Sequence, residues 1–123
     1  RPHGKIYVYD PTAKTTKVLL ENLYFPNGIQ VSPDQQTIYI AETNICRLGR
    51  YHLKGDKTGR YEIVLDGLPG NPDNIKFNSE GHLWVPFPVF RTEFTEKLLS
   101  SLFVRKLLSW VPESLMKLFI NPK

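Results

Sequence analysis

Three polar residues of this sequence have types and spacing that suit metal binding. Asn27 follows Pro26 directly before a stretch of β-forming residues, and Asp73 and Asn74 follow Pro72 in an equivalent place. Amide oxygens and a carboxylate are hard ligands that suit Ca²⁺, which takes about six to eight oxygens. Such an ion could act as a Lewis acid on a carbonyl or phosphoryl oxygen. Asn-Gly and Asp-Asn pairs are also typical of simple turns, so spacing alone leaves both interpretations open.

The two candidate positions belong to a repeated sequence pattern. Residues 18–23 match residues 63–68 at an offset of 45, and residues 26–29 fall on residues 72–75 after a shift of one residue. Short strands repeated at a period of about 45 residues are typical of the blades of a β-propeller. A β-sandwich has no reason to repeat its strands at this period, so the repeat favours a propeller.

Residues with high β-propensity, separated by turn signals, predict six strands in the first half of the chain. They lie at residues 4–10, 17–21, 28–31, 37–42, 46–53 and 61–65. Four short strands make one blade, and about four to eight blades close a propeller. We therefore predict an all-β fold of about two blades, which by itself should expose an apolar sheet face and an unpaired strand edge.

A propeller would bring the candidate residues together, because equivalent residues of adjacent blades lie side by side around its axis. If the strands that follow them are the innermost ones, Asn27, Asp73 and Asn74 converge at one mouth of the central channel. Glu42 ends a predicted strand near the same mouth and is a weaker candidate for positioning a ligand.

Composition and charge are those of a globular protein, with 41% hydrophobic residues, 23% charged residues and a net charge of +4. The cations are spread along the chain without a zinc-finger spacing or recognition helix, which argues against nucleic-acid binding. The single cysteine, Cys46, excludes an internal disulfide framework and suits a buried, inert thiol. His3, His52 and His82 lie in unrelated surroundings, and no Ser/His/Asp or Cys/His arrangement can be assembled.

The pattern changes in the last third of the chain. Apolar residues recur at helical spacing over residues 98–107, and Pro112 would begin a second short helix. We therefore divide the chain into a partial propeller, residues 1–90, and an amphipathic helical insertion, residues 91–123. The insertion could pack on the propeller as a lid, which we favour, or contact a membrane surface through residues 93–120.

Four segments, residues 4–10, 23–29, 40–43 and 68–75, resemble the strictosidine synthase-like family in their order and spacing. The amphipathic segment over residues 98–119 resembles the insertion of the animal branch, the adipocyte plasma membrane-associated proteins, which plant strictosidine synthases generally lack. Because the chain starts without a methionine and without a targeting segment, we expect it to be a piece of a longer protein.

The resemblance implies a six-bladed propeller, distantly related to paraoxonases and other calcium-dependent lactonases and esterases. It implies that Asn27, Asp73 and Asn74 bind one Ca²⁺ in the central channel of the complete propeller. It also implies a single-pass type II membrane protein with arylesterase-like activity on a small ester or lactone. The histidines that act as base in paraoxonases and the catalytic glutamate of plant strictosidine synthase belong to parts outside this chain. No catalytic residue can therefore be named, and we expect this piece to be inactive alone.

The leading hypothesis is therefore a piece of a calcium-dependent arylesterase or lactonase-like hydrolase. One alternative is an amine–aldehyde condensing enzyme of the strictosidine synthase type, for which the missing blades would have to supply a general acid–base. A second alternative is a non-enzymatic, membrane-associated propeller scaffold.

Overall fold

The computed structural model describes residues 1–92, 101, 106 and 110. The chain divides into two compact units, Arg1–Phe90 and Arg91–Lys123. The expected helical insertion lies largely outside the described residues, so its two helices and their lid or membrane role stay predictions. The architecture below is that of the first unit.

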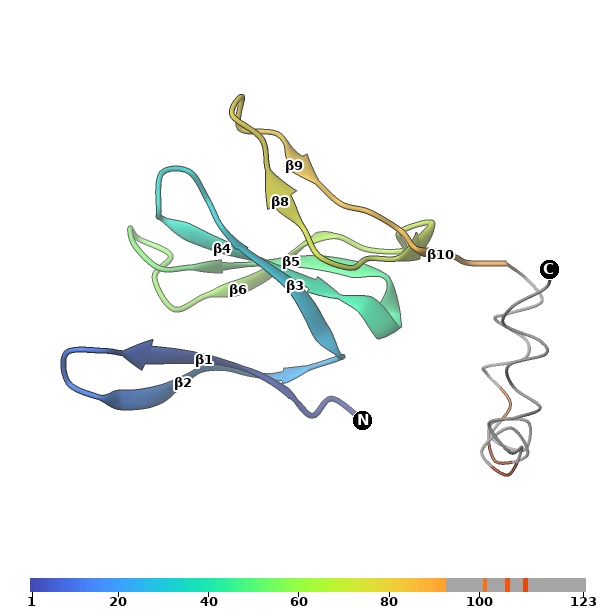
Figure 1. Ribbon diagram of the computed structural model, residues 1–123, viewed down its shortest axis with the longest axis horizontal. Helices are drawn as coiled ribbons and strands as arrows, with labels where there is room; N and C mark the ends of the chain where they lie inside the picture. The colour runs from blue at the N-terminus through green and yellow to red at the C-terminus, as the bar shows by residue number, and fades with distance from the viewer. Residues whose placement is uncertain (93–100, 102–105, 107–109, 111–123) are drawn as a thin grey trace. The chain divides into compact units, whose positions relative to one another are not determined.

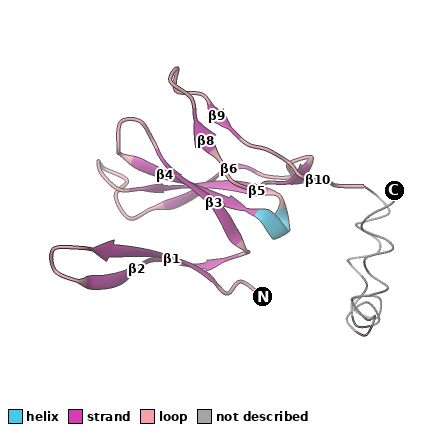
Figure 2. Cartoon of the chain, viewed as in Figure 1, coloured by secondary structure: helices cyan, strands magenta, loops and turns pink. Residues whose placement is uncertain are grey.

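This unit consists of short antiparallel strands and one turn of 3-10 helix (Figure 1; Figure 2). The elements are β1 (Gly4–Asp10), β2 (Thr15–Leu23), β3 (Pro26–Val31), β4 (Thr37–Glu42), η1 (Thr43–Ile45), β5 (Arg47–His52), β6 (Tyr61–Leu65), β7 (Gly70–Asn71), β8 (Lys76–Phe77), β9 (Leu83–Trp84) and β10 (Val89–Phe90). All six predicted strands are present, and none of their ends moves by more than two residues. The predicted all-β fold is confirmed.

Polar side chains close the turns between the strands. The Asp10 carboxylate accepts hydrogen bonds from the backbone N–H groups of Thr12 and Ala13, at 2.8 and 3.0 Å, which reverses the chain after β1. After β3, the Ser32 hydroxyl donates to the Asp34 carboxylate at 2.5 Å. This bond lowers the pKa of Asp34. The turn signals of the sequence therefore act through local hydrogen bonds.

The strands form one complete blade and parts of two others. The complete blade is the sheet ordered β3-β4-β5-β6, while β1-β2, β7-β10 and β8-β9 are separate two-stranded sheets. In the sequence repeat, β1 and β2 correspond to β5 and β6, and β8 and β9 correspond to β3 and β4. The first hairpin is thus the second half of one blade, and β8-β9 is the first half of another. Together they make the two blades that the sequence predicts.

Each face of the complete blade is covered by one of its partial neighbours. Leu23 of β2 packs with Ile40 of β4 on one face, where both side chains are buried. Ala41 is the next residue of β4 and points to the opposite face, where it packs with Leu48 and Ile75. Burying an Ile or Leu side chain contributes about 1.5–3 kcal/mol, so these two clusters hold the β1-β2 and β8-β9 sheets against the four-stranded sheet.

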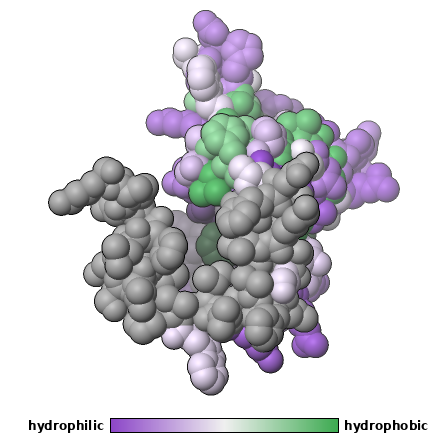
Figure 3. Space-filling model, turned by 90° about the vertical axis from the view of Figure 1, so that its right-hand side faces the viewer, coloured by the Kyte–Doolittle hydropathy of each residue, from purple (hydrophilic) through white to green (hydrophobic). Residues whose placement is uncertain are grey.

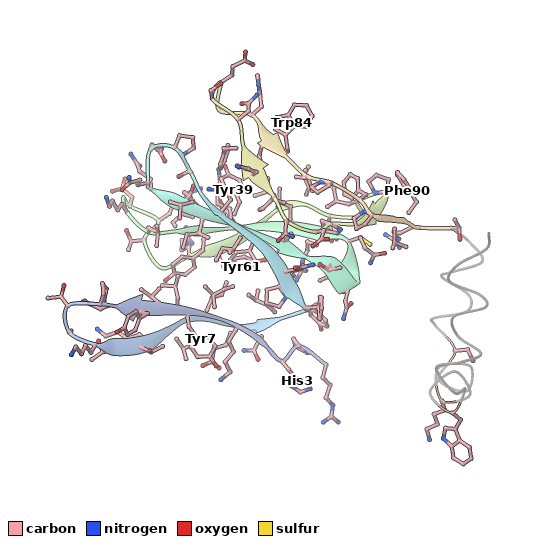
Figure 4. The ribbon with its side chains drawn as sticks, in the orientation of Figure 1. His3, Tyr7, Tyr39, Tyr61, Trp84 and Phe90 are labelled. Carbon is pink, nitrogen blue, oxygen red and sulfur yellow. The ribbon has the colours of Figure 1, made fainter. Side chains whose placement is uncertain are left out.

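The partial blades leave large apolar side chains exposed, as predicted. Tyr7 and Tyr9 of β1 are 59% and 60% exposed, while Trp84 of β9 and Phe90 of β10 are 67% and 64% exposed (Figure 4). Hydrophobic surface is visible among hydrophilic residues in the space-filling view (Figure 3). Within the described residues, β9 pairs only with β8, which leaves one strand edge open. These surfaces are the ones that further blades would cover.

Candidate metal site

The candidate residues lie where β3 begins, where β4 ends and just before β8. Pro26, the first residue of β3, pairs with Glu42, the last residue of β4. Asp73 and Asn74 precede β8, which lies against β3. The strands that follow the two repeated motifs are therefore side by side, and β3 is an edge strand of its sheet. This placement agrees with inner strands of two neighbouring blades.

Asn27 and Asp73 are in direct contact. The Asn27 side-chain amide donates from Nδ2 to Asp73 Oδ1 at 2.6 Å. Asn27 is exposed and Asp73 is half-buried, so solvent reaches this pair. Asn74 is exposed and follows Asp73 directly, but its approach to the first motif is through its backbone, next to Gly28. The structure thus brings two of the three predicted residues into side-chain contact.

The close approach of the two motifs requires Gly28. A Cβ atom at this position would lie 2.2 Å from the Asp73 carbonyl oxygen and 2.8 Å from the Ile75 nitrogen. Gly28 has no positive φ and lies, with Asn27, inside β3. The interpretation that this Asn-Gly pair merely makes a turn is therefore wrong: the glycine is needed because another backbone passes against it.

Hydrogen bonds from η1 connect the two motifs. The Thr43 hydroxyl donates to the Pro72 carbonyl at 2.6 Å, and the Thr43 N–H donates to the Phe25 carbonyl at 3.1 Å. The Asn71 side chain donates to the Thr43 carbonyl at 2.8 Å. Sequence reasoning missed Thr43 and Asn71, because their contacts join segments that are far apart in the chain. The signal available was that both residues lie in segments that resemble the family, Thr43 in residues 40–43 and Asn71 in residues 68–75.

Glu42 has other contacts than the sequence suggested. Its side chain is fully buried, and Oε2 accepts from Arg47 Nε at 2.8 Å and from Nη2 at 2.5 Å. Oε1 accepts from the Tyr24 N–H at 3.4 Å. Both carboxylate oxygens are therefore engaged within the protein, and Glu42 forms a structural ion pair behind the candidate site.

Tyr61 lies on the same face of the blade as Glu42, between the β1-β2 hairpin and the four-stranded sheet (Figure 4). Its hydroxyl is buried and has no hydrogen-bond partner among the described residues. Burial, with a smaller effect of the nearby Glu42 carboxylate, raises the pKa of Tyr61 to about 12. The ring covers Gly49, where a Cβ atom would collide with the phenol. This tyrosine is a packing residue with an unpaired polar group.

A charged cluster occupies the opposite end of β5 and β6 from the candidate site. Glu62 accepts hydrogen bonds from Arg50 and contacts His52 Nε2 at 2.7 Å, with Lys57 at 3.5 Å. The bonds from His52 and Arg50 lower the pKa of Glu62 to about 2. His52 thus contacts the carboxylate at the centre of this cluster. Elsewhere in the blade, the predicted burial of Cys46 is confirmed. These groups lie away from the mouth that holds Asn27.

The donor set fits Ca²⁺ in kind, because it combines amide oxygens with one carboxylate. It does not fit a softer metal: within residues 1–92, no three His, Cys, Asp or Glu side chains gather in a way that could hold an ion. Asn27, Asp73 and Asn74 supply fewer oxygens than Ca²⁺ takes, so they would form part of a site.

In the described part of the chain, no helix has the length and apolarity needed to cross a membrane.

The repeated sheets and the polar residues at the start of their edge strands define a β-propeller. A solved structure of a gluconolactonase from Xanthomonas campestris matches with a TM-score of 0.60 at 22% identity, over 69% of this chain and 29% of that one. This likeness concerns the fold, and it identifies the chain as part of a six-bladed propeller.

Sequence comparison shows which family the chain resembles. The strictosidine synthase family model matches residues 1–56. Strictosidine synthase-like protein 6 of Arabidopsis thaliana is 42% identical over 107 residues, which are 87% of this chain and 28% of that protein. The adipocyte plasma membrane-associated protein of Danio rerio is 37% identical over 116 residues, 94% of this chain and 27% of the relative. Over most of its length the chain is thus similar to members of the strictosidine synthase-like family.

The chain spans little more than a quarter of the length of these relatives. Plant and animal members both match most of it, and the plant match, at 107 residues, must extend beyond residue 90. The last third of the chain therefore does not by itself separate the branches. The place of the chain in the animal branch stays a prediction.

Proposed function

We propose that this chain contributes neighbouring blades and part of a Ca²⁺ site to a calcium-dependent arylesterase or lactonase-like hydrolase. The observation that supports it best is the 2.6 Å contact between Asn27 Nδ2 and Asp73 Oδ1. It joins equivalent positions of two sheets at a solvent-accessible mouth. In the proposal, the amide oxygens of Asn27 and Asn74 and the carboxylate of Asp73 are the ligands that this chain provides.

The chemistry follows from the donor set. When bound, Ca²⁺ would polarise the carbonyl of an ester or lactone and stabilise the developing oxyanion. The chain's own residues hold and orient the ligand atoms. Nδ2 of Asn27 donates to Oδ1 of Asp73, which leaves Oδ1 of Asn27 and Oδ2 of Asp73 for a cation. Gly28 keeps the two motifs close. A nucleophile or general base is expected from other blades, because the described residues of the mouth offer none beyond these ligands.

The lactonase half of the proposal draws on the function of a structural neighbour, a gluconolactonase. At 22% identity this neighbour supports the fold, and the substrate class is tested by an assay. Hydrolysis of aryl esters and of lactones should be measured on this chain placed within a complete propeller, for example in place of the matched segment of the Danio rerio relative.

Calcium titration of the 123-residue chain tests the metal assignment directly. We expect weak binding, with a Kd of about 10⁻⁴–10⁻³ M, because the site is incomplete. Asp73→Ala should weaken binding at least tenfold. Asp56→Ala is the matched control, since it removes an exposed carboxylate from the loop between β5 and β6. If the unmodified chain does not bind Ca²⁺, or if Asp73→Ala binds Ca²⁺ equally well, the assignment is refuted.

A second candidate is an amine–aldehyde condensing enzyme, which the match of residues 1–56 to the strictosidine synthase family favours. This reaction needs a general acid–base, which the missing blades would supply. The same chimeric propeller separates the two reactions: condensation of an amine with an aldehyde, without ester hydrolysis, would favour the second candidate.

Membrane association is the third element of the proposal, and it is supported by the names of the adipocyte plasma membrane-associated relatives. A type II membrane protein that carries this propeller is the expected setting. Flotation of the 123-residue chain with anionic phospholipid vesicles tests whether this chain contributes to it. Flotation equal to that of a protein without membrane affinity would leave only the non-membrane, lid interpretation of residues 93–120.

A further inference from the structure

One residue bridges the two motifs of the candidate site. Thr43 begins η1, directly after β4, and its three polar backbone and side-chain groups face the two motifs. Its N–H donates to the carbonyl of Phe25, two residues before Asn27. Its hydroxyl donates to the carbonyl of Pro72, the residue before Asp73. Thr43 therefore forms hydrogen bonds with both of the segments that carry the candidate ligands.

The segment before Asn27 has a strained backbone at the residue that Thr43 contacts. Phe25 has a φ of 54°, in the left-handed region that an aromatic residue seldom adopts. The bond from the Thr43 N–H holds the Phe25 carbonyl in this conformation. Backbone strain of this kind persists only where the surroundings fix it, and it gathers at functional sites.

The other motif is held from two sides. Pro72 is fully buried, so its carbonyl acceptor is part of a packed region rather than a loose loop. Asn71 adds a return contact from its side chain to the Thr43 carbonyl at 2.8 Å. The segment that enters Asp73 is thus joined to Thr43 by two hydrogen bonds, one at Pro72 and one from Asn71.

We infer that Thr43 is a positioning residue, whose hydroxyl sets the distance between Asn27 and Asp73. This inference rests on the proposed calcium site and deepens it. The two contacts of the Thr43 main chain can be made by any residue other than proline at this position. The hydroxyl contact to Pro72 cannot, so Thr43→Val removes one bond and keeps the side-chain shape.

The experiment combines calcium titration with nuclear magnetic resonance of the 123-residue chain. The first measurement is the Kd for Ca²⁺. The second, made without calcium, is the chemical shift of the Asn27 side-chain amide, which reports the bond to Asp73. We expect Thr43→Val to raise the Kd about threefold to tenfold, as the loss of one hydrogen bond would. It should also shift the Asn27 amide toward the value of a solvent-exposed asparagine.

Two variants control for general damage. Thr43→Ser keeps the hydroxyl and should restore the Kd to within about twofold of the unmodified chain. Thr58→Val removes another threonine hydroxyl that donates to a backbone carbonyl, that of Gly55 at 2.6 Å, in the loop between β5 and β6. It should change neither the Kd nor the Asn27 amide.

The outcomes separate this inference from the proposed function. If the unmodified chain does not bind Ca²⁺, the metal assignment fails, and an unchanged Asn27 amide in Thr43→Val then overturns the positioning role as well. If the chain binds and Thr43→Val binds equally, only the positioning role is overturned. Should Thr43→Val not fold, Thr43→Ala removes the same hydroxyl bond to the Pro72 carbonyl, and unaltered binding by that variant overturns the inference.

Discussion

The buried ion pair between Glu42 and Arg47 offers the sharpest test of how this blade is held together. Glu42 is fully buried, while the Arg47 side chain keeps 22% of its exposure. Two nitrogens of Arg47 donate to the same oxygen of Glu42, at 2.8 and 2.5 Å. Glu42→Gln removes the negative charge with little change of shape, and it leaves the guanidinium partly desolvated without a counter-charge.

The expected cost follows from that burial. Removing one partner of a buried ion pair destabilises a protein by about 3–5 kcal/mol. Because Arg47 is partly exposed, it can regain some hydration, and we expect a loss at the lower end, about 3 kcal/mol. A domain of this size has a stability of about 5–13 kcal/mol, so the loss is a large fraction. It corresponds to a fall in Tm of at least about 12 °C.

Arg47→Met should cost more than Glu42→Gln, because it leaves a carboxylate with no exposure at all. The measurement is the free energy of unfolding in urea for both single variants and the double variant. We expect a coupling energy of about 2 kcal/mol or more from the double-mutant cycle. The exposed pair Lys5–Glu21, at 3.4 Å, is the control and should give at most about 1 kcal/mol. A coupling below about 0.5 kcal/mol for Glu42–Arg47 would refute the reasoning.

Three further predictions concern other groups of the same unit. Tyr61→Phe should stabilise the fold by up to about 1 kcal/mol in urea unfolding, because it removes a buried hydroxyl that lacks a partner in the described part. Because the folded pKa of Tyr61 is raised to about 12, stability should fall between about pH 10 and 12, and less so in Tyr61→Phe. Glu62 has its pKa lowered from 4.5 to about 2, so its stabilisation is present above pH 4.5 and lost as the pH falls toward 2. In Glu62→Gln, the free energy of unfolding should therefore depend less on pH between about pH 2 and 4.5. An equal effect of Glu21→Gln would contradict this. Gly28→Ala should cost about 1–3 kcal/mol and separate the two motifs. Gly59→Ala strains a backbone with a φ of 82° but meets no neighbouring atom, so it should leave calcium binding unchanged.

The fold was largely predictable because propellers repeat themselves. Alternating β-formers and turn residues locate strands, and the offset of 45 between residues 18–23 and 63–68 reveals the blade period. Both signals are local or periodic, so a single sequence contains them. The helical insertion was predicted in the same way, and it lies largely outside the described residues.

The candidate site was only partly predictable, because its geometry depends on contacts between distant segments. The repeat indicated that Asn27 and Asp73 would meet, and they do. Local propensity suggested a turn at Asn27, but the residue lies inside β3, since tertiary pairing overrides propensity. The role of Thr43 and the partner of Glu42 could not be read from the sequence, because nothing local shows which carbonyl or cation a side chain will reach.

Propeller geometry limits what two blades can contribute to a metal site at the axis. Each blade brings the start of one inner strand to the mouth, and this chain has two such starts, at Asn27 and at Asp73–Asn74. These residues offer about three side-chain oxygens to an ion that takes about six to eight. Water, substrate and other inner strands must provide the rest. The calcium affinity of the chain should therefore rise when further blades complete the ring. We expect a factor of ten or more, which corresponds to about 1.4 kcal/mol of added binding free energy. Equal affinity in the 123-residue chain and in a complete chimeric propeller, measured by calcium titration, would show that the ion binds elsewhere than at the axis.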